Sequence, residues 1–144
     1  MRVSTKGRYA LRACLALASI GEDGAPVSIS TLAEKEDISS VFLEQIFFRL
    51  RKAGIVASTR GPGGGFSFAK PLENITVKEL VDAAGENLEL SLCNKSQKKC
   101  TRVGDCMSHH IWVGATDMVN GYFHGITLSS ILKDYKKEPI PATT

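Results

Sequence analysis

The stretch from residue 40 to residue 69 constrains the fold of this 144-residue chain more than any other. Its first half has apolar residues at helical spacing, namely Leu43, Ile46, Phe47 and Leu50, and Gly54 follows them as a stop. The β-branched run IVASTR, the turn cluster GPGGG and the alternating run FSFA come next. Together these three runs predict a β-hairpin that directly follows a helix.

A shorter helix precedes this pair. The run TLAEKED predicts it, with Ser30 or Thr31 as its cap and Glu34 completing a capping box. The tight turn DIS joins it to the helix expected from about residue 40 to residue 53, which gives a helix-turn-helix with the hairpin as a wing. In this arrangement the second helix enters the major groove of DNA and the wing reaches the minor groove or backbone.

The flanking segments predict further helices. One runs from Ser4 to about Ser19, one covers TVKELVDAAG with Thr76 and Glu79 as a capping box, and a long one spans about residues 108–125. Gly114 and Gly121 would weaken the long helix unless a close partner, such as a second chain, packs against them. Thr127 can cap a last short helix, LSSILKDY. The predicted fold class is mostly α with a small β-hairpin, divided into a winged helix-turn-helix domain (residues 1–75), a cysteine loop with the long helix (76–135) and a flexible tail (136–144).

Composition narrows the function classes. A hydrophobic share of 43% and a charged share of 23% are typical of a soluble globular protein, and no run approaches the roughly 18 apolar residues of a membrane span. We therefore expect a cytoplasmic protein without membrane contact. Residues 1–70 carry ten Lys and Arg against six acids, which favours this half for binding a polyanion. The chain has no H-E-x-x-H, P-loop or dinucleotide motif, so we do not expect an enzyme.

The predicted recognition helix supplies most candidate DNA contacts. Its side opposite the apolar stripe presents Ser39, Ser40, Glu44, Gln45, Arg49 and Arg51. Ser, Glu and Gln can pair with base edges, whereas Arg most often holds phosphates. Arg60 precedes GPGGG, where a glycine-rich tip can enter a narrow groove. Arg2 and Lys6, from the basic N-terminal half, complete the candidate set of residues for double-stranded DNA.

Residues 93–112, CNKSQKKCTRVGDCMSHHIW, carry candidate ligands for a metal centre. Cys93, Cys100 and Cys106 can supply three thiolates, and either His109 or His110 can supply a fourth ligand. Sulfur-rich ligation suits zinc or an iron–sulfur cluster, and gaps wider than C-x₂₋₄-C favour a cluster such as [2Fe–2S]. Metal-free redox sensing by these thiols is the alternative. We expect Cys14 to be a small buried core residue.

Three segments resemble the IscR-type branch of bacterial iron–sulfur transcription regulators: MRVSTKGRYALRA, LEQIFFRLRKAGIVASTRGPGGGF and CMSHHIW. The resemblance implies a homodimer in which each chain binds one [2Fe–2S] cluster through Cys93, Cys100, Cys106 and His109, and in which the long helix forms the dimer contact. Cluster occupancy in that family changes which promoters are bound, often to repress cluster-assembly genes. The family's DNA contacts fall at Ser40, Glu44, Gln45 and Arg60, and Glu44 matches the position that separates cluster-dependent from cluster-independent sites.

One spacing departs from the family pattern. Six residues separate Cys93 from Cys100, where five are expected. Related regulators hold a [4Fe–4S] cluster with three cysteines and an acidic residue near the N-terminus, and they sense nitric oxide. Arg8 lies where that acid would be sought, which argues against this alternative. A nitric oxide- or iron-responsive [4Fe–4S] regulator and a metal-free thiol-sensing repressor are the remaining alternatives.

Overall fold

The structure, a computed structural model, describes residues 2–93 and 100–137. Its helices are α1 (Thr5–Ile20), α2 (Ile29–Glu36), α3 (Ser40–Lys52), α4 (Val77–Ala83), α5 (His109–His124) and α6 (Leu128–Lys137), with short 3₁₀ turns η1 (Glu22–Gly24) and η2 (Leu72–Asn74). The strands β1 (Val56–Thr59) and β2 (Gly65–Phe68) form one antiparallel pair. The predicted class, mostly α with a small hairpin, is confirmed. Most of the predicted flexible tail lies outside the described residues.

Hydroxyl side chains start four of the described helices. Thr127 caps α6, as predicted, by accepting a hydrogen bond from the Ser130 amide at 3.1 Å. Ser4 caps α1 by accepting a hydrogen bond from the Lys6 amide, and Thr76 caps α4 by accepting one from the Glu79 amide, as predicted. The predicted start of α2 at Ser30 or Thr31 is wrong. Ser28 is the cap, because its Oγ accepts from the amide of Thr31 at 3.2 Å. The helix therefore begins at Ile29, before the run TLAEKED that predicted it.

The core lies between α1, α2, α3 and α4. The predicted stripe of α3, namely Leu43, Ile46, Phe47 and Leu50, is at most 2% exposed. It packs in one cluster with Leu17 of α1 and Leu32 of α2. Each such side chain stabilises the fold by about 1.5–3 kcal/mol when fully buried. Leu80 of α4 and Leu128 of α6 join the same cluster, so the second half of the chain completes the core of the first. The division at residue 75 stays a prediction.

The hairpin is attached to the helical body through Val27. In the register Val56 faces Phe68 and Thr59 faces Gly65. Val27 adds a short bridge, donating its amide to the Phe66 carbonyl at 2.9 Å and accepting from the Phe66 amide at 2.8 Å. A Cβ atom at Gly65, where φ is +148°, would lie 2.2 Å from the Val27 carbonyl oxygen. Glycine is therefore required where the hairpin meets the body.

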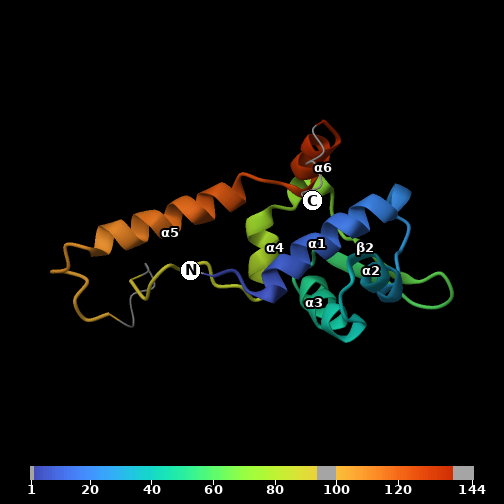
Figure 1. Ribbon diagram of the computed structural model, residues 1–144, viewed down its shortest axis with the longest axis horizontal. Helices are drawn as coiled ribbons and strands as arrows, with labels where there is room; N and C mark the ends of the chain where they lie inside the picture. Colours follow the sequence, from blue (N-terminus) through green and yellow to red (C-terminus); the bar gives the residue numbers. More distant parts are fainter. Residues whose placement is uncertain (1, 94–99, 138–144) are drawn as a thin grey trace, which may run out of the picture.

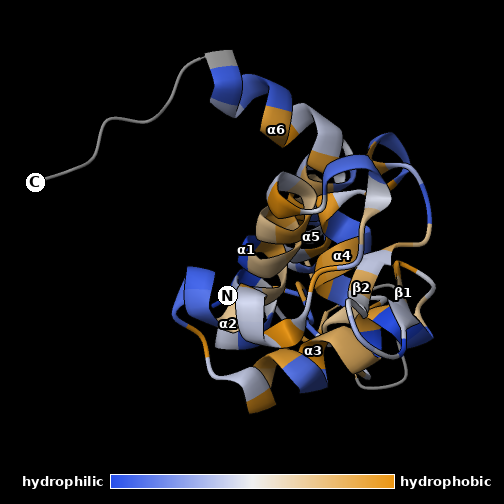
Figure 2. Ribbon diagram, turned by 90° about the vertical axis from the view of Figure 1, so that its right-hand side faces the viewer, coloured by the Kyte–Doolittle hydropathy of each residue, from blue (hydrophilic) through white to orange (hydrophobic). Residues whose placement is uncertain are grey.

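Helix α5 extends away from this body, on the side opposite the hairpin tip (Figure 1). Its far end begins at the cysteine loop, and its near end returns to α4, where the Val77 amide donates to the Ile126 carbonyl at 2.8 Å. A second apolar cluster forms here from Val77, Val81 and Leu88, with Phe123 and Ile126 packed against it. Figure 2, turned by 90°, views the projecting helix nearly along its axis. Its residues Ile111, Met118 and Tyr122 are exposed apolar side chains. Among the described residues, none of the helices is long and apolar enough to cross a membrane.

Candidate DNA-binding surface and metal ligands

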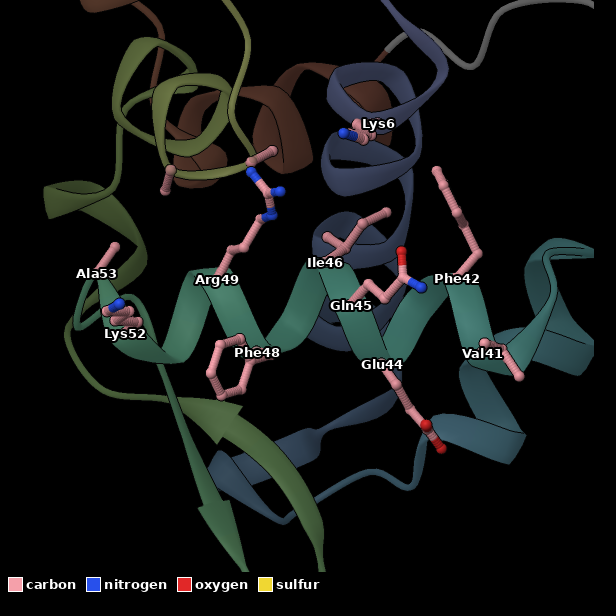
Figure 3. A pocket seen from close by; sticks show the side chains of 12 residues that line it. Lys6, Val41, Phe42, Glu44, Gln45, Ile46, Phe48, Arg49, Lys52 and Ala53 are labelled. Atoms are coloured by element: carbon pink, nitrogen blue, oxygen red, sulfur yellow. The ribbon is translucent and has the colours of Figure 1, made fainter.

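The exposed side of α3 brings together several of the predicted DNA-binding residues. Ser39, Ser40, Glu44 and Gln45 are all exposed, and the Ser39 side chain makes no cap hydrogen bond to the helix. Figure 3 shows Gln45 pointing toward the side of α3 where Lys6 of α1 lies, and Glu44 pointing to the opposite side. Both α3 residues line one open hollow together with Lys6 and Lys52. Amide, carboxylate and hydroxyl groups on such a surface can pair with base edges.

Arg49 points elsewhere, toward the end of α4 (Figure 3). A Cβ atom at Gly85, just after α4, would lie 2.4 Å from Arg49 Nη1, so the guanidinium lies directly against this glycine. A cation at a helix C-terminus is electrostatically favourable. Arg49 therefore connects the recognition helix to α4 in this structure, and its phosphate contact stays a prediction.

Arg51 and Arg60 belong to the wing side of the surface. Arg51 Nη1 donates to Ser58 Oγ of β1 at 3.2 Å, and its guanidinium carbon lies 5.6 Å from the centre of the Phe48 ring. These contacts fix the hairpin to the end of α3. Arg60 is exposed at the hairpin tip, next to Gly61 and Gly63, whose φ angles of +94° and +71° shape the turn. Both arginines are available at the edge of the surface that α3 presents.

The carboxylate of Glu86, three residues after the end of α4, fixes the basic N-terminal segment. Glu86 accepts hydrogen bonds from the amides of Ser4 and Gly7, each at 3.1 Å, and from the Ser4 hydroxyl. Partial burial acts to raise the pKa of Glu86, but these hydrogen bonds and the charge of Lys6 outweigh it and lower the pKa. The carboxylate thereby holds the start of α1, which places the exposed Lys6 beside the surface of α3. Arg2 is exposed, and its DNA contact stays a prediction.

Two of the four predicted metal ligands, Cys106 and His109, lie at the start of α5. All four cysteines of the chain are free thiols, and Cys93, Cys100 and Cys106 are partly exposed, whereas Cys14 is buried. The six residues between Cys93 and Cys100 lie outside the described residues. Within the described ranges, the structure does not bring three or more His, Cys, Asp or Glu side chains close enough to hold a metal ion. The predicted ligands are therefore near in sequence but not gathered at one point.

Cys106 and His109 are joined through the first turn of α5. The His109 amide donates to the Cys106 carbonyl at 3.2 Å, and the Cys106 Sγ lies 3.2 Å from Ser108 Oγ. The hydrogen bonds with Ser108, together with one from His109 and the charge of Arg102, lower the pKa of the Cys106 thiol. His109 is buried at 9% exposure, and the adjacent His110 is exposed. Thiolate is the form of cysteine that binds metals, so the donor set has the chemistry of a sulfur-rich centre.

Three residues of this region are not among those predicted from the sequence: Val41, Phe48 and Glu86. Val41 and Phe48 are apolar residues of α3 that lie outside its buried stripe. Their helical spacing relative to that stripe could have predicted that they are exposed. Glu86 is 82 residues from Ser4 along the chain, and no local pattern indicates that the two make contact.

Comparisons with known proteins identify the family and support the fold. The model of the Rrf2 family, described as "Iron-dependent Transcriptional regulator", matches residues 3–134. The transcriptional regulator IscR of Cronobacter sakazakii is 38% identical over 134 residues, which cover 93% of this chain and 82% of that protein. IscR of Photobacterium profundum is 36% identical over 140 residues, covering 97% of this chain and 80% of that protein.

Solved structures show the same likeness. That of T. potens IscR superimposes with a TM-score of 0.77 at 30% identity, covering 99% of this chain and 94% of that chain. That of CymR (YrzC), described as the global cysteine regulator of B. subtilis, gives a TM-score of 0.73 at 26% identity, covering 92% and 97%. The winged-helix fold and the resemblance stated from the sequence are both confirmed.

Proposed function

Because this chain belongs to the Rrf2 family of transcriptional regulators, we propose that it is a dimeric, mainly repressing regulator that senses iron–sulfur status through a [2Fe–2S] cluster. Family membership makes it a DNA-binding regulator rather than an enzyme. The observation that carries the finer proposal is a set of three partly exposed free cysteines, one of which, Cys106, lies with the buried His109 at the start of a helix that is packed on the DNA-binding body.

The proposed DNA contacts follow from the exposed surface of the winged helix. Ser39, Ser40, Glu44 and Gln45 would read base edges from α3, while Arg60 would follow the minor groove from the wing. Arg2 and Lys6 would hold phosphates beside α3, because Glu86 fixes the segment that carries them. Arg49 and Arg51 would act first by positioning α3, since one lies against Gly85 and the other binds Ser58.

The donor set fits an iron–sulfur cluster by its chemistry. Cys93, Cys100 and Cys106 would supply thiolates, and His109, or the adjacent His110, would supply the fourth ligand. A bound cluster supplies a centre whose stability depends on iron supply and oxidants. Because the described ligands are not gathered in this structure, binding requires the cysteine loop to change its conformation. Such a change of conformation is a suitable input for a two-state regulator.

Packing provides a route from that loop to the recognition helix. Thr116 of α5 accepts a hydrogen bond from the Leu90 amide at 3.3 Å, which ties the segment before the loop to the middle of α5. The near end of α5 packs on α4 through Phe123 and Ile126. Beyond α4, Gly85 contacts Arg49 of α3 and Glu86 holds α1. A movement of α5 would therefore reach both elements that we propose contact DNA.

An exposed apolar face on α5 supports the proposed homodimer. Ile111, Met118 and Tyr122 are 67%, 78% and 67% exposed, and their spacing places them on one side of the helix. Large exposed apolar patches on a monomer mark interaction surfaces. A second copy of α5 would cover this face, which would also explain glycines at positions 114 and 121, where a Cβ atom would meet nothing within 4 Å of the single chain.

The cluster is tested on protein purified without oxygen, by visible absorption with iron and acid-labile sulfide assays. We expect a charge-transfer band with about two irons and two sulfides per chain. The band should be lost in Cys106→Ala and kept in Cys14→Ala, the matched control, because Cys14 is buried in the core. About four irons per chain would favour the [4Fe–4S] alternative. Protein that stays colourless after reconstitution would contradict the proposal and leave zinc or bare thiols as the sensor.

The switch is tested by measuring DNA binding with and without the bound cluster. Duplexes selected from a random-sequence library by each form are suitable probes. We expect the two forms to prefer different sequences, because the change of loop conformation biases α3 through α4. Identical affinities of both forms for every duplex would disprove the switch even if the ligands are correct.

A further inference from the structure

Helix α3 carries two large apolar side chains on its exposed side that the proposed contacts do not use. Val41 is 66% exposed and Phe48 is 56% exposed. The other large apolar residues that are strongly exposed, among those the structure describes, all lie at or beyond Leu92. We propose that Val41 and Phe48 read thymine bases through the C5-methyl group, one on each side of the base position contacted by Glu44. This inference rests on the proposed DNA-binding function.

The spacing of the residues supports this assignment. Val41, Glu44 and Phe48, called here the outer ridge, are three and four residues apart and point from the same side of α3 (Figure 3). At 1.5 Å per residue, Val41 and Phe48 are separated by about 10 Å along the helix axis. With base pairs stacked about 3.4 Å apart, a helix lying along the groove would bring them to positions roughly three base pairs from each other.

The charges around the outer ridge favour DNA over an apolar partner. Lys6, Arg49 and Lys52 line the same hollow as the ridge, and Glu44 is the one acid among the described residues that line it. A cationic rim around apolar side chains fits a polyanion whose groove also presents methyl groups. The carboxylate of Glu44 fits as well, because cytosine presents an amino donor in the major groove.

The ring of Phe48 is held in place before DNA binds. Arg51 lies over it, with 5.6 Å between the guanidinium carbon and the ring centre, and is itself anchored to Ser58 of β1 at 3.2 Å. More than half of the Phe48 side chain nevertheless stays exposed. The ring is therefore a fixed apolar surface, which loses little conformational freedom when it contacts a methyl group.

Thymine is the base that presents a methyl group in the major groove. Uracil forms the same base pair with adenine but lacks this methyl, so deoxyuridine removes one apolar contact and leaves every hydrogen-bonding group in place. Loss of one well-buried methyl contact corresponds to a roughly fourfold higher dissociation constant. The proposal therefore predicts that uracil weakens binding at two thymine positions, about three base pairs apart.

The experiment uses a duplex that the full-length protein selects from a random-sequence library. The duplex is resynthesised with deoxyuridine at one thymidine at a time, and dissociation constants are measured for wild type, Val41→Ala and Phe48→Ala. For wild type we expect deoxyuridine at each of the two positions to lower the affinity roughly fourfold. Val41→Ala should abolish the loss at one position and Phe48→Ala at the other. Tyr135→Ala, which removes an exposed aromatic side chain from α6, is the matched control and should keep both losses.

Two outcomes would overturn the inference while leaving DNA binding intact. Equal affinity of wild type for the thymine and uracil duplexes would show that no methyl is read. An unchanged uracil penalty in both alanine variants would show that the methyl acts through DNA shape and not through the outer ridge. If wild type selects no DNA sequence at all, the proposed regulator function fails, and the assignment of the outer ridge fails with it.

Discussion

Glu86 is a single carboxylate that fixes the start of α1. Its pKa lies below the ordinary value of 4.5, because hydrogen bonds from Ser4 and Gly7 outweigh the effect of burial. A lowered folded-state pKa means that the ionised group stabilises the fold above the unfolded-state pKa. This contribution is lost as the pH falls through the folded-state value. We expect Glu86→Gln to lower the free energy of unfolding by about 1 kcal/mol at pH 7, as for an anion at a helix N-terminus.

Urea unfolding at a series of pH values measures this effect. The difference between wild type and Glu86→Gln should be largest above pH 4.5 and should shrink as the pH falls through the folded-state pKa. Glu73→Gln, which alters an exposed carboxylate on η2, is the control and should change little. A difference between Glu86→Gln and wild type that stays constant with pH would show that the charge is not involved.

Cys14 contrasts with the three other cysteines in the same chain. Burial raises its pKa to about 12, so almost no thiolate forms at neutral pH. In reduced, metal-free protein we expect three thiols to react rapidly with a colorimetric thiol reagent, and a fourth only in denaturant. Cys14→Ala should remove the slow thiol and keep the three fast ones. Four fast thiols in the native protein would contradict the buried position.

At the scale of one element, the hairpin depends on Gly65. Alanine there would place Cβ 2.2 Å from the Val27 carbonyl oxygen and would strain a φ of +148°. We expect Gly65→Ala to destabilise the protein by about 1–3 kcal/mol and to weaken DNA binding by displacing the wing. Thermal unfolding and DNA titration measure these two effects. Gly104→Ala is the control for stability, since its Cβ would meet nothing within 4 Å; equal melting temperatures of the two variants would refute the prediction.

Most elements could be predicted because their signals are local. The caps at Ser4 and Thr76 and the GPGGG turn depend on residues a few positions apart. The predicted start of α2 was wrong because three nearby residues, Ser28, Ser30 and Thr31, carry hydroxyl groups that can cap a helix. The choice is made by Val27, which pairs with Phe66 of the hairpin and so turns the chain at Ser28. That pairing spans 39 residues of sequence, beyond the reach of a capping rule.

The candidate donors are visible in the sequence, whereas side-chain orientations are not. Short spacing in one loop predicts the three cysteines, with His109 or His110, as ligands, and this assignment stays a prediction. The direction of Arg49 was not predictable, because it depends on Gly85 of a different segment lying against α3. The hydrogen bond from the Ser4 amide to Glu86 was not predictable for the same reason, because the two residues lie on segments distant in sequence. Contacts between segments distant in sequence arise from the way the helices pack. A residue pattern predicts which side of a helix is buried, but it does not predict which other helix packs against that side.

At the scale of the whole molecule, the exposed apolar face of α5 is where we propose that two chains meet. In a symmetric dimer each substitution on this face acts twice. Since burial of a methionine side chain contributes about 1.5–3 kcal/mol, we expect Met118→Lys to weaken dimerisation by at least about a hundredfold. Sedimentation equilibrium measures this change. Tyr135→Lys, on α6, is the control and should remain dimeric. A Met118→Lys protein with unchanged association would place the dimer contact elsewhere.

Residues 89–125, which carry the proposed sensing centre, leave and rejoin the body at neighbouring points. Leu88 precedes the cysteine loop and Ile126 follows α5, and both contribute to the same apolar cluster on α4. The chain then continues to Leu128, which is fully buried in the main core. Topologically, residues 89–125 form an insertion between two fixed attachment points. Lengthening the loop, or exchanging its ligands, would therefore leave the path of the DNA-binding body unchanged, so the sensing chemistry can diversify independently of the part that reads DNA.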